Sequence, residues 1–334
     1  MGKFVVRRLL LLVPILLGLS VLVFGYVRAL PGGPVDALLG ERSTPEKKAQ
    51  IEHLYGLDRP IYVQYGKFLE RAVRLDFGTS ITTQRPVSAE IRSRFPATVE
   101  LSAAGLLFAV GGGIPLGYAA ARRYQSWFDN ASIVLSLLGI SIPVFFLAFL
   151  LKYLFAVKLG WLPSVGRQDP ALIADHPTGF YVLDGILTGN LAASVDAIRH
   201  LVLPGLALGS IPLAIITRIT RASVLEVTNE DYVRTAESKG LTRRVITRRH
   251  VLRNAMLPVV TVIGLQTGLL LSGAVLTEIV FAWGGMGQFM YDAIFSRDFA
   301  VLQGGILFIA FVFVIVNLLV DLSYGFIDPR VRAR

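Results

Sequence analysis

Runs of apolar residues follow one another along the chain with the length of membrane-crossing helices. A helix needs about 20 mostly apolar residues to cross the hydrocarbon core of a bilayer. Six stretches approach or exceed this length, and they predict an all-α polytopic membrane protein: residues 9–30, 99–121, 131–157, 201–217, 259–281 and 301–323. The fourth is short and contains Pro204, Gly205, Gly209 and Pro212. A helix bundle tolerates such breaks because neighbouring helices bond the freed backbone groups.

The first stretch has two interpretations, because it follows the basic residues Lys3, Arg7 and Arg8. A secretory signal peptide also begins with basic residues, but its apolar core usually spans about 7–15 residues and a small-residue cleavage site follows it. The apolar core here is longer and no such site follows. We therefore expect a retained helix.

The segments between the spans predict how the chain is organised. Residues 45–76 mix charged and apolar positions, which indicates short helices, one of them starting near Pro45 and stopping at Tyr55-Gly56-Leu57. The sequence predicts a stub with the first span (1–30), a long outer segment (31–98), a core with spans two to six (99–323) and a basic tail (324–334). The core includes a second outer segment (158–199) and an inner loop (218–257).

Composition and charge agree with a membrane protein. Of the 334 residues, 54% are hydrophobic and 17% charged, against about 25% charged residues in soluble domains. The absence of cysteine excludes disulfides and thiolate metal sites. The net charge of +10 is compatible with nucleic-acid binding or with the orientation signal of a membrane protein.

The position of the charge decides between these two interpretations. With both termini in the cytoplasm, the inner segments hold 17 of the 33 basic residues and only seven of the 23 acidic ones, Asp321 included. The whole excess of positive charge therefore lies on one face, as the positive-inside rule predicts. The inner segments are residues 1–8, 122–130, 218–257 and 324–334.

The sequence offers little for catalysis. It contains neither a G-x-x-x-x-G-K-[ST] phosphate-binding loop nor an H-E-x-x-H zinc motif, so we expect no enzyme, no bound metal and no cofactor of its own. No charged residue lies clearly at a bilayer midplane, where ion-coupled carriers place one. Polar residues of the last two spans are candidates to line a transport path, although hydrogen bonds between helices would explain them equally well: Gln266, Thr267, Ser272, Glu278 and Asn317.

The inner loop contains a short helix with its own start and stop signals. Asn229 is a suitable N-cap, the acidic residues after it complement the positive end of the helix dipole, and Gly240 can adopt the left-handed conformation that ends a helix. A helix of about ten residues is marginal alone in water, so we expect it to dock on something. The arginine-rich residues 242–257 after it show no clean helical stripe, and Pro258 is expected to open the fifth span. The alternative is a basic linker that faces lipid.

This loop resembles the EAA loop of ABC-importer permeases in its dipeptide/oligopeptide form. Arg234-Thr235-Ala236 stand where the general pattern has Glu-Ala-Ala, Gly240 matches its glycine and Leu257-Pro258 its end, although the spacing between them is longer. The resemblance extends over nearly the whole chain. It includes the motifs Arg7-Arg8-Leu9, Leu30-Pro31-Gly32-Gly33-Pro34, Leu57-Asp58-Arg59-Pro60, Leu75-Asp76-Phe77-Gly78-Thr79-Ser80, Arg85-Pro86-Val87, Phe95-Pro96-Ala97-Thr98-Val99-Glu100, His200-Leu201-Val202-Leu203-Pro204 and Thr277-Glu278 with Trp283-Gly284-Gly285-Met286-Gly287.

The resemblance implies a type I ABC-importer permease fold in a bacterial inner membrane. It implies that the short helix couples the permease to a cytoplasmic ATPase, that a second, homologous permease completes the path, that two ATPase subunits bind the ATP, and that an external binding protein delivers the peptide. The residues expected to contact the ATPase are Tyr232, Arg234, Thr235, Ala236, Glu237, Lys239 and Gly240. Alternatives are the same architecture with nickel, glutathione, haem or an oligosaccharide as cargo, a stand-alone secondary carrier, or a membrane scaffold that does not transport.

Overall fold

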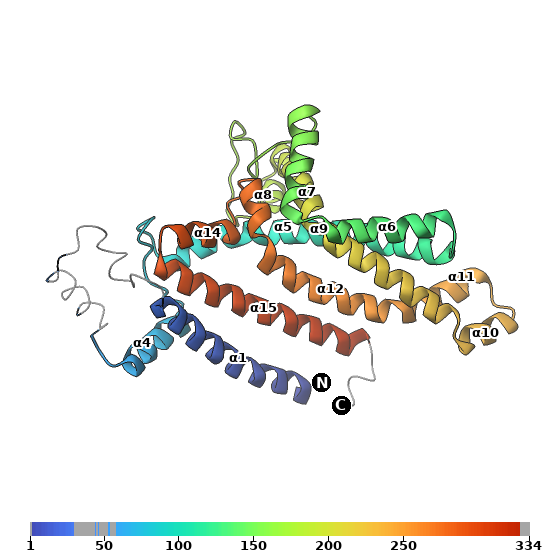
Figure 1. Ribbon diagram of the computed structural model, residues 1–334, viewed down its shortest axis with the longest axis horizontal. Helices are drawn as coiled ribbons and strands as arrows, with labels where there is room; N and C mark the ends of the chain where they lie inside the picture. The colour runs from blue at the N-terminus through green and yellow to red at the C-terminus, as the bar shows by residue number, and fades with distance from the viewer. Residues whose placement is uncertain (1, 30–43, 45, 47–52, 54–57, 328–334) are drawn as a thin grey trace. The chain divides into compact units, whose positions relative to one another are not determined.

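The protein is all-α, as the apolar pattern predicts. The computed structural model describes residues 2–29, 44, 46, 53 and 58–327, and over these residues it contains helices and one isolated β-bridge, between Thr79 and Pro86, but no β-strand. The helices, with η marking π-helices, are α1 (Gly2–Ala29), α4 (Ile61–Val73), α5 (Val87–Arg122), α6 (Trp127–Ser141), α7 (Val144–Leu151), η2 (Lys152–Lys158), α8 (Tyr181–Leu187), α9 (Leu191–Thr228), α10 (Asp231–Ser238), α11 (Arg243–Val245), η3 (Ile246–Leu252), α12 (Arg253–Gly273), α13 (Val275–Val280), α14 (Met286–Phe295) and α15 (Phe299–Ile327) (Figure 1).

Some sequence predictions fall outside the described residues. These are the helix start at Pro45, the stop at Tyr55-Gly56-Leu57, the motif at 30–34 and the basic tail after Ile327. The described part of the first outer segment does contain one predicted short helix, α4.

The chain forms two compact units, and α5 and α15 contribute to both. Unit 1 comprises Met1–Ala97 and Gly284–Ile315, and unit 2 comprises Thr98–Trp283 and Val316–Arg334. The predicted division of the chain into a first span, an outer segment, a core and a tail stays a prediction.

Unit 1 joins the first helix to the outer segment through aromatic and polar contacts. The ring of Phe24 on α1 lies 5.3 Å from that of Tyr65 on α4, edge to face, and the hydroxyls of Ser20 and Tyr65 are 2.8 Å apart. Further along, the Ser80 hydroxyl donates to Asp298 at 2.6 Å, and Asp298 also accepts the Val301 N–H at the start of α15. Tyr65 and Ser80 of the outer segment are thus held within this unit.

Unit 2 is built around α9, which packs against α6, α7, α8 and α12 (Figure 1). The sequence prediction of a short, broken span at 201–217 is wrong, because α9 is one helix of 38 residues. Pro204 and Pro212 lie inside it and are buried. Each proline lacks the N–H that would bond the carbonyl four residues earlier, and such losses are tolerated where neighbouring helices surround the segment.

Glycines allow α9 to approach α5 at backbone contact. A Cβ atom added to Gly209 would overlap the carbonyl oxygen of Gly105 on α5, and one added to Gly205 would lie 3.2 Å from the Ala104 Cβ. Small residues permit such close packing between membrane helices. Gly205 and Gly209, which the sequence analysis took as breaks in a helix, are therefore the positions where α9 contacts α5.

The third predicted span is not a straight helix. α6 and α7 meet at an angle of 102°, and Ile142, the residue before Pro143, is extended with ψ 122°. A proline disfavours the helical conformation of its preceding residue, which explains the break. Among the described residues, five helices are long and apolar enough to cross a membrane, or six if this bent pair counts as one span.

The fifth predicted span also differs from the structure. The helical run containing it begins at Arg243, so Pro258 lies inside α12 and does not open it, and the run is interrupted at Ala274 before α13. Helices also extend beyond other predicted limits, since α5 begins at Val87 and α9 at Leu191, within the predicted outer segments. Apolar length alone predicts the part of a helix inside the bilayer and misses turns that continue into the aqueous region.

We expect Gly209→Ala to destabilise the protein. The added methyl group would press α9 away from α5, and overpacking of this kind costs about 1–3 kcal/mol. Gly111→Ala on α5 is the matched control, because no atom of the described residues lies within 4 Å of the place its methyl group would take and alanine favours helix. The thermal midpoint of each variant in one detergent is the measurement. A midpoint for Gly209→Ala at or above that of Gly111→Ala would contradict the contact.

Candidate functional site

The helix predicted in the inner loop is present as α10, and its C-terminal end has the predicted conformation. Gly240 has φ +73°. Its N–H bonds the Glu237 carbonyl at 2.9 Å, and the Leu241 N–H bonds the Ala236 carbonyl at 3.3 Å. This pair of bonds is a Schellman motif, which satisfies the last carbonyls of a helix.

The start of α10 differs from the prediction. The N-cap is Glu230, which has φ −70° and ψ 145° and, among the described residues, no side-chain capping bond. Asn229 instead closes the preceding helix α9, and its side-chain amide donates to the Leu225 carbonyl at 3.0 Å. The prediction of Asn229 as N-cap is wrong because α9 continues through residue 228, so Asn229 has helical backbone angles where an N-cap is extended.

One face of α10 packs on its own subunit. Val233 and Ala236 are 2% and 4% exposed. They belong to a hydrophobic cluster that joins α10 to α5, α9, η3 and α12, here called the loop core: Ala121, Val224, Val233, Ala236, Ile246, Val251 and Ala255. Ala236, predicted to contact an ATPase, is therefore turned inward and helps to seat the helix.

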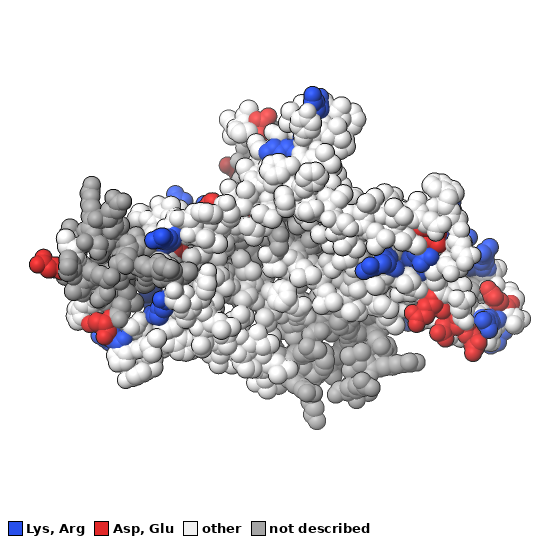
Figure 2. Space-filling view, viewed as in Figure 1, with Lys and Arg blue, Asp and Glu red and all other residues white. Residues whose placement is uncertain are grey.

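The opposite face of α10 is exposed. Six of the seven predicted contact residues are exposed. Tyr232, Arg234, Thr235 and Glu237 lie on α10, and Lys239 and Gly240 follow its end. The Tyr232 hydroxyl also accepts a hydrogen bond from the Asn254 amide at 3.0 Å. Charged side chains gather at the end of unit 2 that carries α10 and α11 (Figure 2). The structure thus presents exposed polar side chains on a helix supported by apolar packing.

A π-helix explains why residues 242–257 show no regular apolar stripe. η3 covers Ile246–Leu252, and a π-helix bonds residues five apart instead of four. Its buried residues follow this spacing, since Ile246 and Val251 are five positions apart and Ala255 follows four later. Arg248 and Arg249 remain exposed. The segment is helical and packed on one side, and the alternative of a basic linker that faces lipid stays a prediction.

An ion pair that the sequence analysis missed fixes the helix before this loop. Arg221 on α9 donates through Nε and Nη2 to both carboxylate oxygens of Asp129 on α6. Asp129 is 1% exposed and also accepts the Gln125 N–H at 3.0 Å. The only signal in the sequence was one acid and one base on inner segments, 92 residues apart. Two-point pairing of arginine with a carboxylate defines orientation as well as distance.

The residues predicted to line a path lie on three helices. Thr267 and Ser272 bond carbonyls of their own helix, at 2.8 Å to Ile263 and 3.1 Å to Leu269. Gln266 is buried on α12, and Asn317 is half-buried on α15. Glu278 on α13 is fully buried and accepts a hydrogen bond from the Thr98 hydroxyl at 2.6 Å. Their role in a path stays a prediction.

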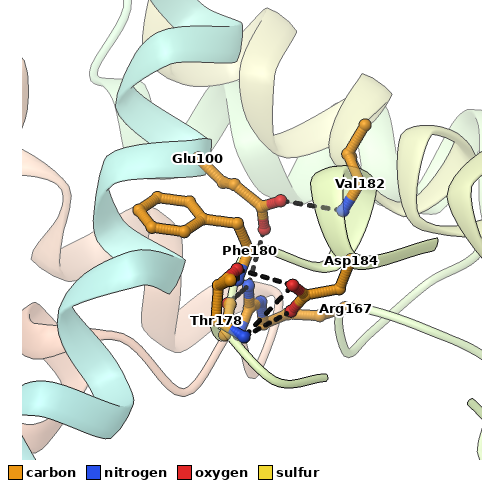
Figure 3. Close-up of polar contacts among 7 residues, drawn as sticks. Glu100, Arg167, Thr178, Phe180, Val182 and Asp184 are labelled. Carbon is orange, nitrogen blue, oxygen red and sulfur yellow. Dashed lines mark hydrogen bonds and ion pairs between the residues drawn. The ribbon is translucent and has the colours of Figure 1, made fainter. Parts of the chain in front are cut away.

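A second polar site, not singled out by the sequence analysis, lies in the predicted outer part of unit 2 (Figure 3). We call it the outer polar cluster: Glu100, Arg167, Thr178 and Asp184. Glu100 on α5 accepts from Arg167 at 2.6 Å and from the Val182 N–H at 2.9 Å. Asp184 on α8 is fully buried and accepts from the Thr178 backbone and hydroxyl. The cluster ties residues 167–184 to α5.

An aromatic stack stabilises the same loop. The rings of His176 and Tyr181 are parallel with centroids 3.5 Å apart, and the Arg167 guanidinium carbon lies 3.8 Å from the centre of the Tyr181 ring. Two groups this close to one ring centre must occupy opposite faces, so Tyr181 lies between them. Among the described residues, no group of three or more His, Asp or Glu side chains is arranged to hold a metal ion.

Two family models of one transport component match the chain and together cover nearly all of it. Residues 113–333 match the model of the binding-protein-dependent transport system inner membrane component, and residues 1–102 match the model of its N-terminal part.

Individual relatives cover nearly the full length. The dipeptide transport system permease protein DppB of Alkalihalophilus pseudofirmus is 44% identical over 332 residues, which are 99% of this chain and 100% of the relative. The di/tripeptide permease DppB of Pseudomonas aeruginosa is 45% identical over 333 residues, 99% of each chain. The glutathione permease GsiC of Salmonella paratyphi A is 38% identical over 332 residues, again 99% of each.

We expect the loop around His176 to loosen at low pH. Burial lowers the pKa of His176; Asp184 and Glu100 raise it and Arg167 lowers it further. The folded state therefore favours the neutral ring, so this stabilisation is complete above the unfolded pKa of about 6.5 and is lost as the pH falls below it. Hydrogen exchange of residues 167–184 at pH 7.5 and 5.0 measures the change.

His176→Phe is the control, because phenylalanine keeps a ring against Tyr181 and cannot be protonated. The wild type should lose more protection between the two pH values than this variant does. Equal losses would show that His176 does not carry the pH dependence.

Proposed function

The chain belongs to the family of binding-protein-dependent transport system inner membrane components, and from this membership we propose that it is the permease subunit of an ATP-driven importer of dipeptides and short oligopeptides. The observation that carries the substrate class is the 44–45% identity, over 99% of the chain, to permeases named for dipeptides and di/tripeptides. Such a chain is a multi-pass inner-membrane protein that works with a substrate-binding protein and ABC partners.

The finer assembly is part of the proposal. A second, homologous permease completes the path, and two cytoplasmic ATPase subunits supply the energy, because this sequence contains no G-x-x-x-x-G-K-[ST] loop of its own. Both termini lie in the cytoplasm. The concentration of basic residues in the inner segments supports this orientation.

We propose that α10 transmits movement from the ATPase to the membrane. Its exposed face carries Arg234, Glu237 and Lys239, which suit a polar groove on a partner. Its buried face belongs to the loop core, which also contains residues of η3 and α12. A displacement of α10 therefore carries the beginning of α12 with it, because close-packed interiors transmit strain.

A second candidate cargo is glutathione, which the 38% identity to a glutathione permease favours. Glutathione is itself a modified tripeptide, so the two cargoes share a charged amino group, carboxylates and an amide backbone. The architecture and the proposed coupling are the same for both.

Reconstitution of the complex tests the function. The chain, its partner permease, the ATPase subunits and the binding protein are placed in liposomes, and ATP hydrolysis is measured with dialanine, trialanine, glutathione or no ligand. We expect dialanine to stimulate hydrolysis and to accumulate inside the vesicles. If glutathione alone stimulates, the peptide assignment is wrong; if uptake proceeds without ATPase subunits along an ion gradient, the importer assignment is wrong.

We expect Gly240→Val to uncouple ATP hydrolysis from transport. No atom of the described residues lies within 4 Å of a Cβ at this position, so the cost arises from φ +73° alone, a conformation that a β-branched residue strongly disfavours. Lys239→Val, next to it at φ −79°, is the control for the loss of polar surface. Transport per ATP hydrolysed should fall several-fold more in Gly240→Val than in Lys239→Val. An assembled Gly240→Val complex with wild-type coupling would refute the docking role of α10.

A further inference from the structure

The short helix α13 is held at three points by other elements of unit 2. The Lys152 ammonium, at the start of the π-helix η2, donates to the carbonyl of Val280 at the end of α13, over 2.8 Å. The Gly166 N–H donates to the Phe281 carbonyl at 2.8 Å. On the side of α5, the Thr98 hydroxyl donates to Glu278 at 2.6 Å.

This part of unit 2 is closed to solvent. Glu278 is fully buried, Thr98, Phe281 and Trp283 are each 2% exposed, and Thr277 is 1% exposed. A buried carboxylate inside a membrane protein is costly and usually serves a function. Apolar residues of similar size often stabilise as well as a buried ionic group, so packing alone does not account for a glutamate here.

The same helix is linked, through one run of helices and a short break, to the loop that we propose to contact the ATPase. A helical run leads from α11 through η3 and α12 to Gly273, and α13 follows after one residue, Ala274. η3 and α12 contribute Ile246, Val251 and Ala255 to the loop core, against α10. The joint at Ala274 is therefore the place where movement of α12 would act on α13.

We propose that α13 is an outer gate of the transport path, and that Thr98, Lys152 and Glu278 are positioning residues that latch it shut. The proposal rests on the proposed function. The latch contacts from Thr98 and Lys152 are hydrogen bonds that involve a charged group, and the loss of one such bond changes an equilibrium by roughly ten- to a hundredfold. Val280 and Phe281 also pack in an apolar cluster with residues of α7 and α9. In the proposal this packing seats the closed gate, and the hydrogen bonds are the directional contacts that movement of α12 breaks.

The absence of cysteine from the chain gives a direct test. Thr277→Cys places a single thiol on α13, where the side chain is buried and its hydroxyl has no hydrogen-bond partner among the described residues. In the full reconstituted complex we measure the rate at which a membrane-impermeant maleimide, added outside, labels this thiol. The resting protein should be protected, and trapping with ATP and vanadate should expose the thiol.

Latch variants are then added to Thr277→Cys. Thr98→Val removes the hydroxyl at nearly constant volume, and Lys152→Met removes the ammonium. Each should raise resting labelling and ATP hydrolysis without peptide by roughly tenfold or more. Thr98→Ser, which keeps the hydroxyl, should restore both. Lys158→Met on the same π-helix is the control, since Lys158 is exposed and should have no effect.

The outcomes separate the gate from the function. If wild type shows peptide-stimulated hydrolysis but Thr98→Val and Lys152→Met label at the resting wild-type rate, the latch is refuted and the importer stands. If Thr98→Ser labels as fast as Thr98→Val, packing and not the hydroxyl is responsible, which also refutes it. If wild type shows no stimulation by any peptide, the proposed function fails, whatever the labelling shows.

Discussion

Unit 2 depends on the close approach of α9 to α5. Gly105, Gly205 and Gly209 bring the two backbones together, and at Gly117 an added Cβ would overlap the Thr217 carbonyl. Apolar burial drives association weakly inside a bilayer, because lipid tails are as apolar as side chains, so contact between small residues must provide the attraction. α6, α7, α8 and α12 then pack against α9, and their positions follow from this contact.

The contact also determines where the functional loop can lie. α9 ends at Thr228 and α10 begins three residues later, at Asp231. Arg221 on α9 pairs with Asp129, and the loop core seats α10 beside the same end of α9. Because α10 is too short to be stable alone, its position is determined by these neighbours, and a partner that binds its exposed face meets a preformed surface.

The sequence predicted the features that depend on neighbouring residues. The apolar stretches located the spans, and Gly240 located the end of α10, because span length and helix termination are local properties. The 102° bend at Pro143 and the π-helix η3 were missed. A proline permits either a bend or a continuous helix, as Pro212 shows, and the choice depends on the packing around it.

The outer polar cluster was missed for a related reason. Glu100 and Arg167 are 67 residues apart, and Glu100 and Val182 are 82 apart, so no local pattern pairs them. At Asn229 a local pattern was present but gave the wrong role. The residue type suits an N-cap, but in the structure Asn229 is the C-cap of the preceding helix α9. Residue type limits what a side chain can bind, and the fold selects the partner.

The two ends of unit 2 are held by different kinds of interaction. Near the loop, Arg221 and Asp129 form a two-point ion pair in which Asp129 is 1% exposed, and breaking such a pair costs about 3–5 kcal/mol. At α13 the contacts from Thr98 and Lys152 are hydrogen bonds that involve a charged group, worth about 1.5–3 kcal/mol each, and Val280 and Phe281 add apolar packing. Under the proposed coupling, a movement that starts at α10 would act on the hydrogen bonds of α13, while the two-point ion pair keeps α6 and α9 together near the loop.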